Sequence, residues 1–123
     1  MKASRILFRP MSFTRKYIVD QYITNHENAY MNYFLRRAIF SKNSELIKVM
    51  DKSEMLTIPV KKEVFQELCY FSDYSELQFL MDNVVEIRHN LEDYIKHVDI
   101  CSRDVIDKKN IEENLKLLEQ ELN

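Results

Sequence analysis

The chain has 123 residues, 46% of them hydrophobic and 31% charged, so it is long enough and apolar enough to fold as one domain without disulfide bonds. It contains no glycine and only two prolines. The lack of glycine excludes the glycine-rich loops that bind nucleotide phosphates and the tight nucleophile elbow, and it argues against a β fold built from many hairpins.

The formal net charge of −2 conceals an uneven distribution of charge. Residues 1–62 carry twelve Lys or Arg against five Asp or Glu (+7), whereas residues 63–123 carry six against fifteen (−9). We expect a single helical domain over 1–123, with a basic half and an acidic half. The asymmetry fits binding to a polyanion, a self-complementary assembly, or neutralisation of one half by the other.

The first nineteen residues hold five basic side chains and no acidic one. Three interpretations fit them, ranked in this order: a basic edge of the fold, an arm that binds nucleic acid, and a mitochondrial targeting peptide. Pro10 opposes the last, because it interrupts the helix that such a peptide forms. For a nucleic-acid arm the candidate phosphate contacts are Arg5, Arg9, Arg15, Lys16, Arg36 and Arg37.

The apolar spacing in the rest of the basic half predicts three helices, and their aromatic residues are expected to face the core. The predicted helices cover about 12–25, 27–40 and 43–50, and a fourth begins at about residue 61. Between them, Pro59 biases Ile58 toward an extended backbone. A minor two-stranded β element, pairing residues 4–9 with 55–58, is therefore an additional expectation.

Two sets of residues recur every seven positions in the acidic half. They are Leu77, Val84, Leu91 and Val98, and, offset by three, Leu80, Ile87, Tyr94 and Cys101. This a/d pattern over four heptads predicts one long helix that packs lengthwise along another. A last helix, from Asp104 or Asp107 to the end, supplies the second arm of a long antiparallel hairpin. The predicted fold class is thus mainly α, a small helical bundle with this hairpin at its C-terminal end.

The residues that could carry chemistry do not converge in this pattern. His89, Asp93 and His97 are four apart, and Glu86 precedes His89 by three, as in the Glu-x-x-His step of di-iron bundles. The chain has no second such step, and these positions avoid the a/d seam. Cys101 occupies a core-type position, which argues against a reactive thiolate. We therefore expect no enzyme activity, no catalytic or metal-binding residues, and no cofactor.

The sequence then favours a protein-interaction module: a small inhibitor, regulator or accessory subunit that binds a larger protein complex through its helices, with a nucleic-acid-handling complex as one candidate. The expected interface is the apolar seam and its acidic rim, namely Leu77, Leu80, Val84, Ile87, Leu91, Tyr94, Glu86, Glu92 and Asp93. Its partner would be a protein with a basic surface or a second copy of the chain. Direct nucleic-acid binding by the basic half is the alternative. We expect no membrane span, no small-molecule substrate and a cytoplasmic, reducing location, with mitochondrial targeting left open.

Overall fold

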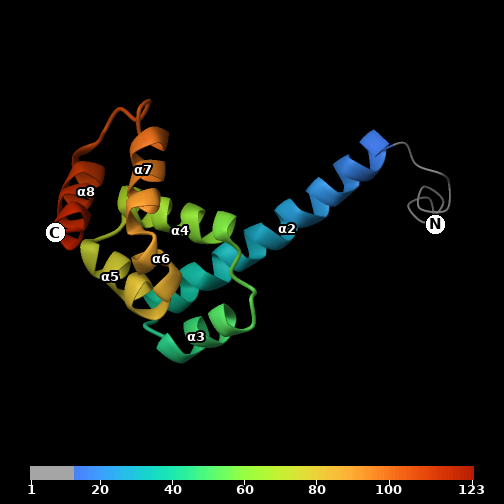
Figure 1. Ribbon diagram of the computed structural model, residues 1–123, viewed down its shortest axis with the longest axis horizontal. Coiled ribbons are helices and arrows are strands. Elements are labelled where there is room, and N and C mark those ends of the chain that lie inside the picture. Colours follow the sequence, from blue (N-terminus) through green and yellow to red (C-terminus); the bar gives the residue numbers. More distant parts are fainter. Residues whose placement is uncertain (1–12) are drawn as a thin grey trace.

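The computed structural model describes the backbone of residues 13–123 and the side chains from residue 16 onward. Over that part of the chain the backbone forms seven helices and no strand, which confirms a mainly α, small helical bundle (Figure 1). The helices are α2 (Phe13–Phe40), α3 (Ser44–Lys52), α4 (Ile58–Phe71), α5 (Tyr74–Asn83), α6 (Val85–His89), α7 (Leu91–Cys101) and α8 (Lys109–Glu121).

Helix α4 is the centre of the bundle, and α2, α5, α7 and α8 pack around it. Its buried apolar side chains are Val60, Val64, Phe65, Leu68 and Cys69. They belong to one continuous core to which the other long helices contribute. Burial of this single apolar cluster is the main stabilising term that the fold offers.

The start of α4 explains why no strand forms at residues 55–58. Thr57 caps the helix, and its hydroxyl accepts a hydrogen bond from the Val60 amide at 3.4 Å. Pro59 lies in the first turn, where its missing N–H would have had no helical partner. The proline therefore begins a helix that already includes Ile58, and the expected extended backbone is wrong at that residue. The other half of the expected β pair, 4–9, lies outside the described residues.

The heptad pattern identifies the buried residues correctly but not the element. Seven of its eight members are buried, and only Cys101 is exposed. The expected long helix is instead divided into α5, α6 and α7. At the breaks, the Asn83 side-chain amide donates to the Phe79 carbonyl at 2.8 Å, and that of Asn90 donates to the Glu86 carbonyl at 3.0 Å. At each break, therefore, an asparagine side chain bonds to a carbonyl group of the preceding turn.

Helices α7 and α8 lie next to each other and run in opposite directions (Figure 1). They form the predicted antiparallel hairpin, but their 11 and 13 residues make it short, and both helices rest against α4. The buried Asn114 of α8 donates its side-chain amide to the carbonyls of Cys69 and Ser72, each at 3.0 Å. Helix α8 therefore satisfies carbonyl groups at the end of α4.

Helix α2 begins outside the bundle and ends inside it, as one uninterrupted helix of 28 residues and not the two that the sequence suggested (Figure 1). Its C-terminal half buries Leu35, Ala38 and Ile39. On the same side of the helix, the earlier turns carry the polar residues Gln21 and Thr24. The core-facing stripe ends there, which explains why the N-terminal half extends away from the other helices. No helix in the described part of the chain is both long enough and apolar enough to cross a membrane.

Candidate interaction surface on helix α2

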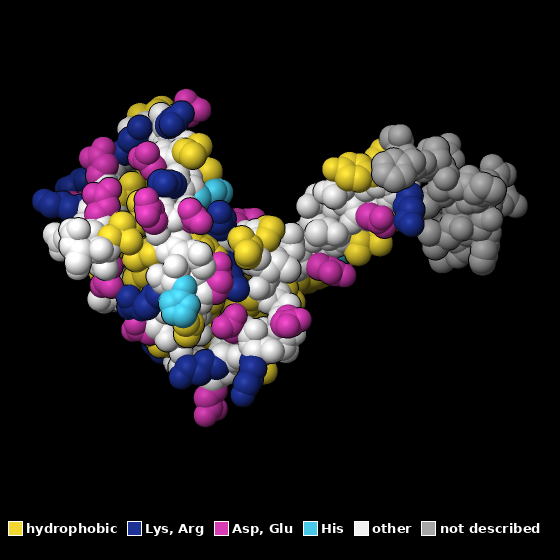
Figure 2. Space-filling view, in the orientation of Figure 1, with side chains coloured by type: hydrophobic (Ala, Val, Ile, Leu, Met, Phe, Trp, Pro, Cys, Tyr) yellow, Lys and Arg dark blue, Asp and Glu magenta, His cyan; other side chains and the backbone are white. Residues whose placement is uncertain are grey.

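The most prominent exposed apolar feature is a row of residues along α2 that we call the outer stripe. Its members are spaced alternately by four and three positions: Val19, Ile23, His26, Tyr30, Tyr33, Arg37 and Phe40. This spacing keeps them on one side of a helix, the side opposite the core-facing residues. Its large hydrophobic members are about half exposed: Ile23 49%, Tyr30 53%, Tyr33 47% and Phe40 55%. Figure 2 shows hydrophobic side chains on the half of α2 that projects from the bundle.

Aromatic contacts organise the middle of this surface. The ring centroids of Tyr22 and His26 are 6.1 Å apart in a stacked arrangement, and those of His26 and Tyr30 are 4.9 Å apart edge to face. Tyr30 in turn stacks on Phe34 at 6.4 Å. Because each pair is four residues apart on one helix, the rings are ordered by α2 itself and present a preformed apolar surface.

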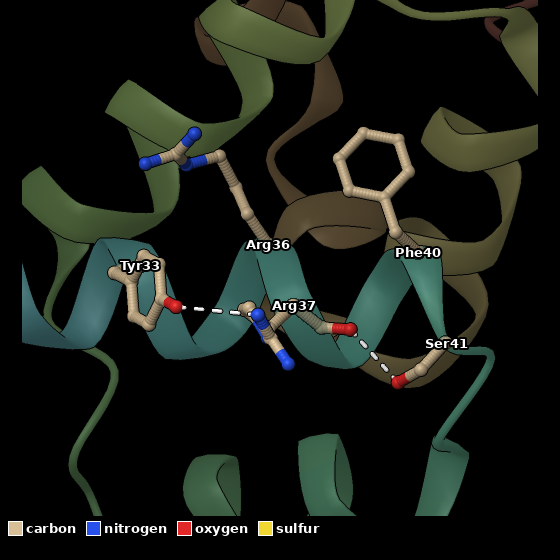
Figure 3. A pocket seen from close by; sticks show the side chains of 5 residues that line it. All are labelled: Tyr33, Arg36, Arg37, Phe40 and Ser41. Carbon is tan, nitrogen blue, oxygen red and sulfur yellow. Dashed lines mark hydrogen bonds between the residues drawn. The ribbon is translucent and has the colours of Figure 1, made fainter.

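The C-terminal end of the outer stripe is hollowed (Figure 3). A cavity of about 380 Å³ is lined by Tyr33, Arg36, Arg37, Phe40 and Ser41. The Arg37 guanidinium donates a hydrogen bond to the Tyr33 hydroxyl at 3.3 Å and lies 5.7 Å from the centre of that ring. This contact holds the charged group along the stripe, so Arg37 offers both an apolar stem and a positive head.

A second hollow lies where α2 meets the connection between α3 and α4. Its volume is about 410 Å³, and its lining includes Glu27, Phe34, Glu54 and Met55. Another hollow, of about 360 Å³, is lined by His26, Ala29, Tyr30 and Tyr33. The concave parts of the α2 surface therefore follow the outer stripe and its flank.

A polar cluster fixes the rotation of α2 on α4. The buried Asn32 donates its side-chain amide to the carboxylates of Glu63, at 2.7 Å, and Glu67, at 2.6 Å. Arg36 completes the cluster by donating its Nε to the Asn32 side-chain oxygen at 2.6 Å. Since these bonds would break if α2 turned about its axis, they keep the outer stripe directed away from the bundle.

The apolar part of the interface predicted from the heptads is occupied by this chain's own core. Leu77, Leu80, Val84, Ile87, Leu91 and Tyr94 are all buried, the most exposed of them by only 5%. They pack against α4 and its neighbours and cannot reach a partner while the domain keeps this fold, so that assignment is corrected. Of the predicted acidic rim, Glu92 and Asp93 are exposed on α7.

The third rim residue, Glu86, belongs to a polar cluster inside the bundle. Its carboxylate accepts a hydrogen bond from the Tyr94 hydroxyl and lies 3.7 Å from Nζ of Lys61. Lys61 is only 7% exposed and is also 3.7 Å from the Asp51 carboxylate. Burial, and then the bond to Glu86, raise the pKa of Tyr94 well above its usual range. These groups neutralise one another and tie α3, α4, α6 and α7 together.

The predicted phosphate contacts do not form one basic patch in the described part of the chain. Lys16 is exposed near the start of α2, whereas Arg36 and Arg37 lie near its end, about 30 Å away along the helix. Asp20 and Glu27 lie between them. Arg5, Arg9 and the side chain of Arg15 are outside what the structure describes.

The remaining candidates for chemistry lie on the surface of α6 and α7. His89 and Asp93 are exposed, and His97 hydrogen-bonds through Nε2 to the Gln66 side chain at 2.9 Å. Burial, and then the nearby charge of Lys62, lower the pKa of His97. Among the described residues, no group of three His, Cys, Asp or Glu side chains is close enough to hold a metal ion.

Cys101 lies 3.8 Å from Nε2 of His97 and is exposed, contrary to the core position expected from the heptads. The chain ends α7 at this residue, so the seam has no further helix against which to bury it. Cys69 is buried in α4, and burial raises its pKa from 9.0 to about 12. Only one of the two thiols is therefore open to solvent.

Sequence reasoning did not find the outer stripe, because aromatic residues at helical spacing were assigned to the core. The signal was present in the spacing of Ile23, His26, Tyr30 and Tyr33, which continues where the core-facing side of α2 becomes polar. No protein-family model, curated protein or solved structure matches this chain.

Proposed function

We propose that this chain is a non-enzymatic protein-interaction module, a regulator or accessory subunit, that binds by helix-on-helix packing along the outer stripe of α2. The observation that carries the proposal is the position of the stripe. It lies opposite the core, and it continues along the half of α2 that leaves the bundle. That half contributes nothing to the core, so its apolar side chains have no role in holding this domain together.

The energetics of an isolated helix support this proposal. A helical segment of about 12–15 residues is only marginally stable in water unless its apolar face packs on something. The projecting half of α2 exposes Ile23 of the outer stripe by 49% and Tyr22, which flanks it, by 70%. Monomeric proteins seldom expose continuous apolar surface of this kind unless it binds a partner. A docked helix would remove this surface from water and stabilise the segment.

The arrangement of the polar groups supports a role without catalysis. The buried Lys61 is paired with Glu86, and the buried Asn32 is hydrogen-bonded to Glu63 and Glu67. The hollows along α2 are lined by aromatic and aliphatic side chains together with charged and polar ones. Catalysis requires an acid, a base or a nucleophile directed at one point, whereas recognition requires only a complementary surface.

The test compares three tagged proteins expressed in the source cell: wild type, Ile23→Glu in the outer stripe, and Ile106→Glu in the connection between α7 and α8. Ile106 is fully exposed, so it provides the same chemical change away from the stripe. We expect proteins recovered with the wild type to be recovered equally with I106E and at least about tenfold less with I23E. Equal recovery with all three, or recovery of nuclease-sensitive nucleic acid instead of protein, would contradict the proposal.

A further inference from the structure

We propose that the occupant of the outer stripe is the same stripe of a second copy of this chain, with the two α2 helices antiparallel. This inference rests on the proposed function, because it names the partner of that surface. In heptad terms Ile23, Tyr30 and Arg37 take one seam position and Val19, His26, Tyr33 and Phe40 take the other. The pattern is the seam of a coiled coil, here on the solvent side of a helix whose opposite side is already packed.

The orientation follows from Arg37. In a parallel pair each seam residue faces its own counterpart, so two Arg37 guanidinium groups would meet inside the seam and repel each other. In an antiparallel pair the two seam positions face each other instead. Arg37 then faces the partner's Val19, beside the partner's Asp20. Asp20 of each chain is thus close to Arg37 of the other chain, and a symmetric dimer forms this pair twice.

The register follows from the length of the exposed stripe. When His26 faces the partner's Tyr30, Ile23 faces the partner's Tyr33, and Lys16 faces the partner's Phe40. The helices then overlap over residues 16–40, about 36 Å. Residues 13–15 of α2 extend beyond this overlap, past Phe40 of the partner. In this register the two copies of residue 28 lie at the same height, so the two copies of Ala29 lie one residue to either side of the centre, at the edge of the seam.

The area is sufficient for a specific dimer. A fully enclosed aromatic side chain buries about 150–250 Å². The aromatic members of the stripe are about half exposed and recur on both chains, and the exposed surfaces of Ile23, His26 and Arg37 add to theirs. Pairing therefore buries on the order of 1,000 Å² over both chains, which is the lower bound for a specific protein interface. The stacked rings from Tyr22 to Phe34 are ordered before association, which reduces the entropy lost on binding.

Sedimentation equilibrium of the purified full chain tests the dimer. We expect wild type and I106E to sediment at twice 14.9 kDa, and I23E to raise the dissociation constant by about 100-fold or more. Asp20→Arg and Arg37→Asp should each weaken the dimer about tenfold, and their combination should restore it to within about threefold of wild type. Helical circular dichroism of each variant, measured above its dissociation constant, serves as the control for folding.

Cross-linking with a short bismaleimide tests the orientation. In a Cys101→Ser background, Ala29→Cys should cross-link to its counterpart, whereas Ser41→Cys should not, because antiparallel pairing places the two copies of residue 41 at opposite ends. Cross-linking through residue 41 would overturn the antiparallel arrangement. A monomeric wild type, or a dimer insensitive to I23E, would overturn the choice of occupant. If the wild type is monomeric but its capture of other proteins still depends on Ile23, the proposed function stands and only this inference fails.

Discussion

The two cysteines differ in exposure, and this difference predicts their reactivity. Alkylation requires the thiolate. Cys101 is exposed, whereas burial raises the pKa of Cys69 from 9.0 to about 12 and also blocks access to it. With iodoacetamide at pH 8 we expect one alkyl group to be added rapidly and the second on the order of 100-fold more slowly. Mass spectrometry of the time course, with tryptic mapping, identifies which residue reacts first.

In urea both thiols should react at similar rates, which is the control for this experiment. Two similar rates in the folded protein would show that Cys69 is not held in the core.

The same shift of the Cys69 pKa has a consequence for stability. The unfolded Cys69 thiol ionises from about pH 9, whereas the folded one stays protonated to about pH 12. The free energy of unfolding therefore decreases as pH rises through that window.

His97 predicts the opposite dependence at the acid side. Burial, and then the charge of Lys62, lower the pKa of its imidazole below the ordinary 6.5. As pH falls below 6.5 the unfolded chain takes up this proton first, so the free energy of unfolding decreases. We expect the loss between pH 7.5 and 5.5 to be larger in the wild type than in His97→Gln, which keeps a polar group near Gln66. Urea denaturation of both proteins at the two pH values measures the difference. Equal losses would show that His97 titrates alike in both states.

At the scale of elements, the ends of the helices depend on asparagine. Asn114 donates to two carbonyl groups at the end of α4 and is buried. Asn114→Ala removes both bonds, while Asn110 still donates its side-chain amide to the same two carbonyl groups, so we expect the free energy of unfolding to fall by about 1 kcal/mol. Asn123→Ala, a change of the same residue type at the exposed chain end, should leave it within about 0.5 kcal/mol of the wild type. Urea denaturation measures both, and equal effects would contradict the capping role.

The heptad residues of α5, α6 and α7 and the proline of α4 differ in how far the sequence predicted their structure. The heptad pattern over residues 77–98 predicted burial correctly, because a residue every seven positions returns to the same side of a helix. The pattern did not predict that the helix is interrupted. Helices α5, α6 and α7 each contribute a turn or more to the same core, and at the breaks the side chains of Asn83 and Asn90 bond to carbonyl groups of the preceding turn. Pro59 was ambiguous for a related reason. A proline disfavours a helix that continues through the residue before it, but it favours a helix that has it in the first turn. Thr57 caps such a helix here, so α4 begins at this point.

The spacing of apolar residues along α2 did not show which of its sides would pack against the bundle. From Met31 onward both sides carry apolar residues, so neither could be assigned to the core from spacing alone. The side of α2 that packs is fixed by contacts with α4, because Glu63 and Glu67 of α4 accept hydrogen bonds from Asn32. Such a contact, between residues more than 30 positions apart, leaves no mark on local periodicity.

At the scale of the whole molecule, the charge asymmetry is neutralised in part within the chain. From residue 16 onward, two ion pairs join the basic half to the acidic half: Arg36 with Glu67 at 3.9 Å, and Lys61 with Glu86 at 3.7 Å. Other acidic residues, such as Glu92 and Asp93 on α7, remain exposed. The molecule is therefore a compact bundle around α4 with one helix that extends from it, and that helix carries both charges and an apolar face (Figures 1 and 2).

The most direct test of this account is amide hydrogen exchange along α2 in wild type and Ile23→Glu, at a concentration where the wild type is paired. If the outer stripe is covered by a second copy, amides of residues 16–27 should be protected in the wild type and exchange at least about tenfold faster in the variant. Amides of α4 should not change between the two proteins. Rapid exchange of residues 16–27 in the wild type, or equal protection in both proteins, would contradict the claim that this helix is held by a partner through its outer stripe.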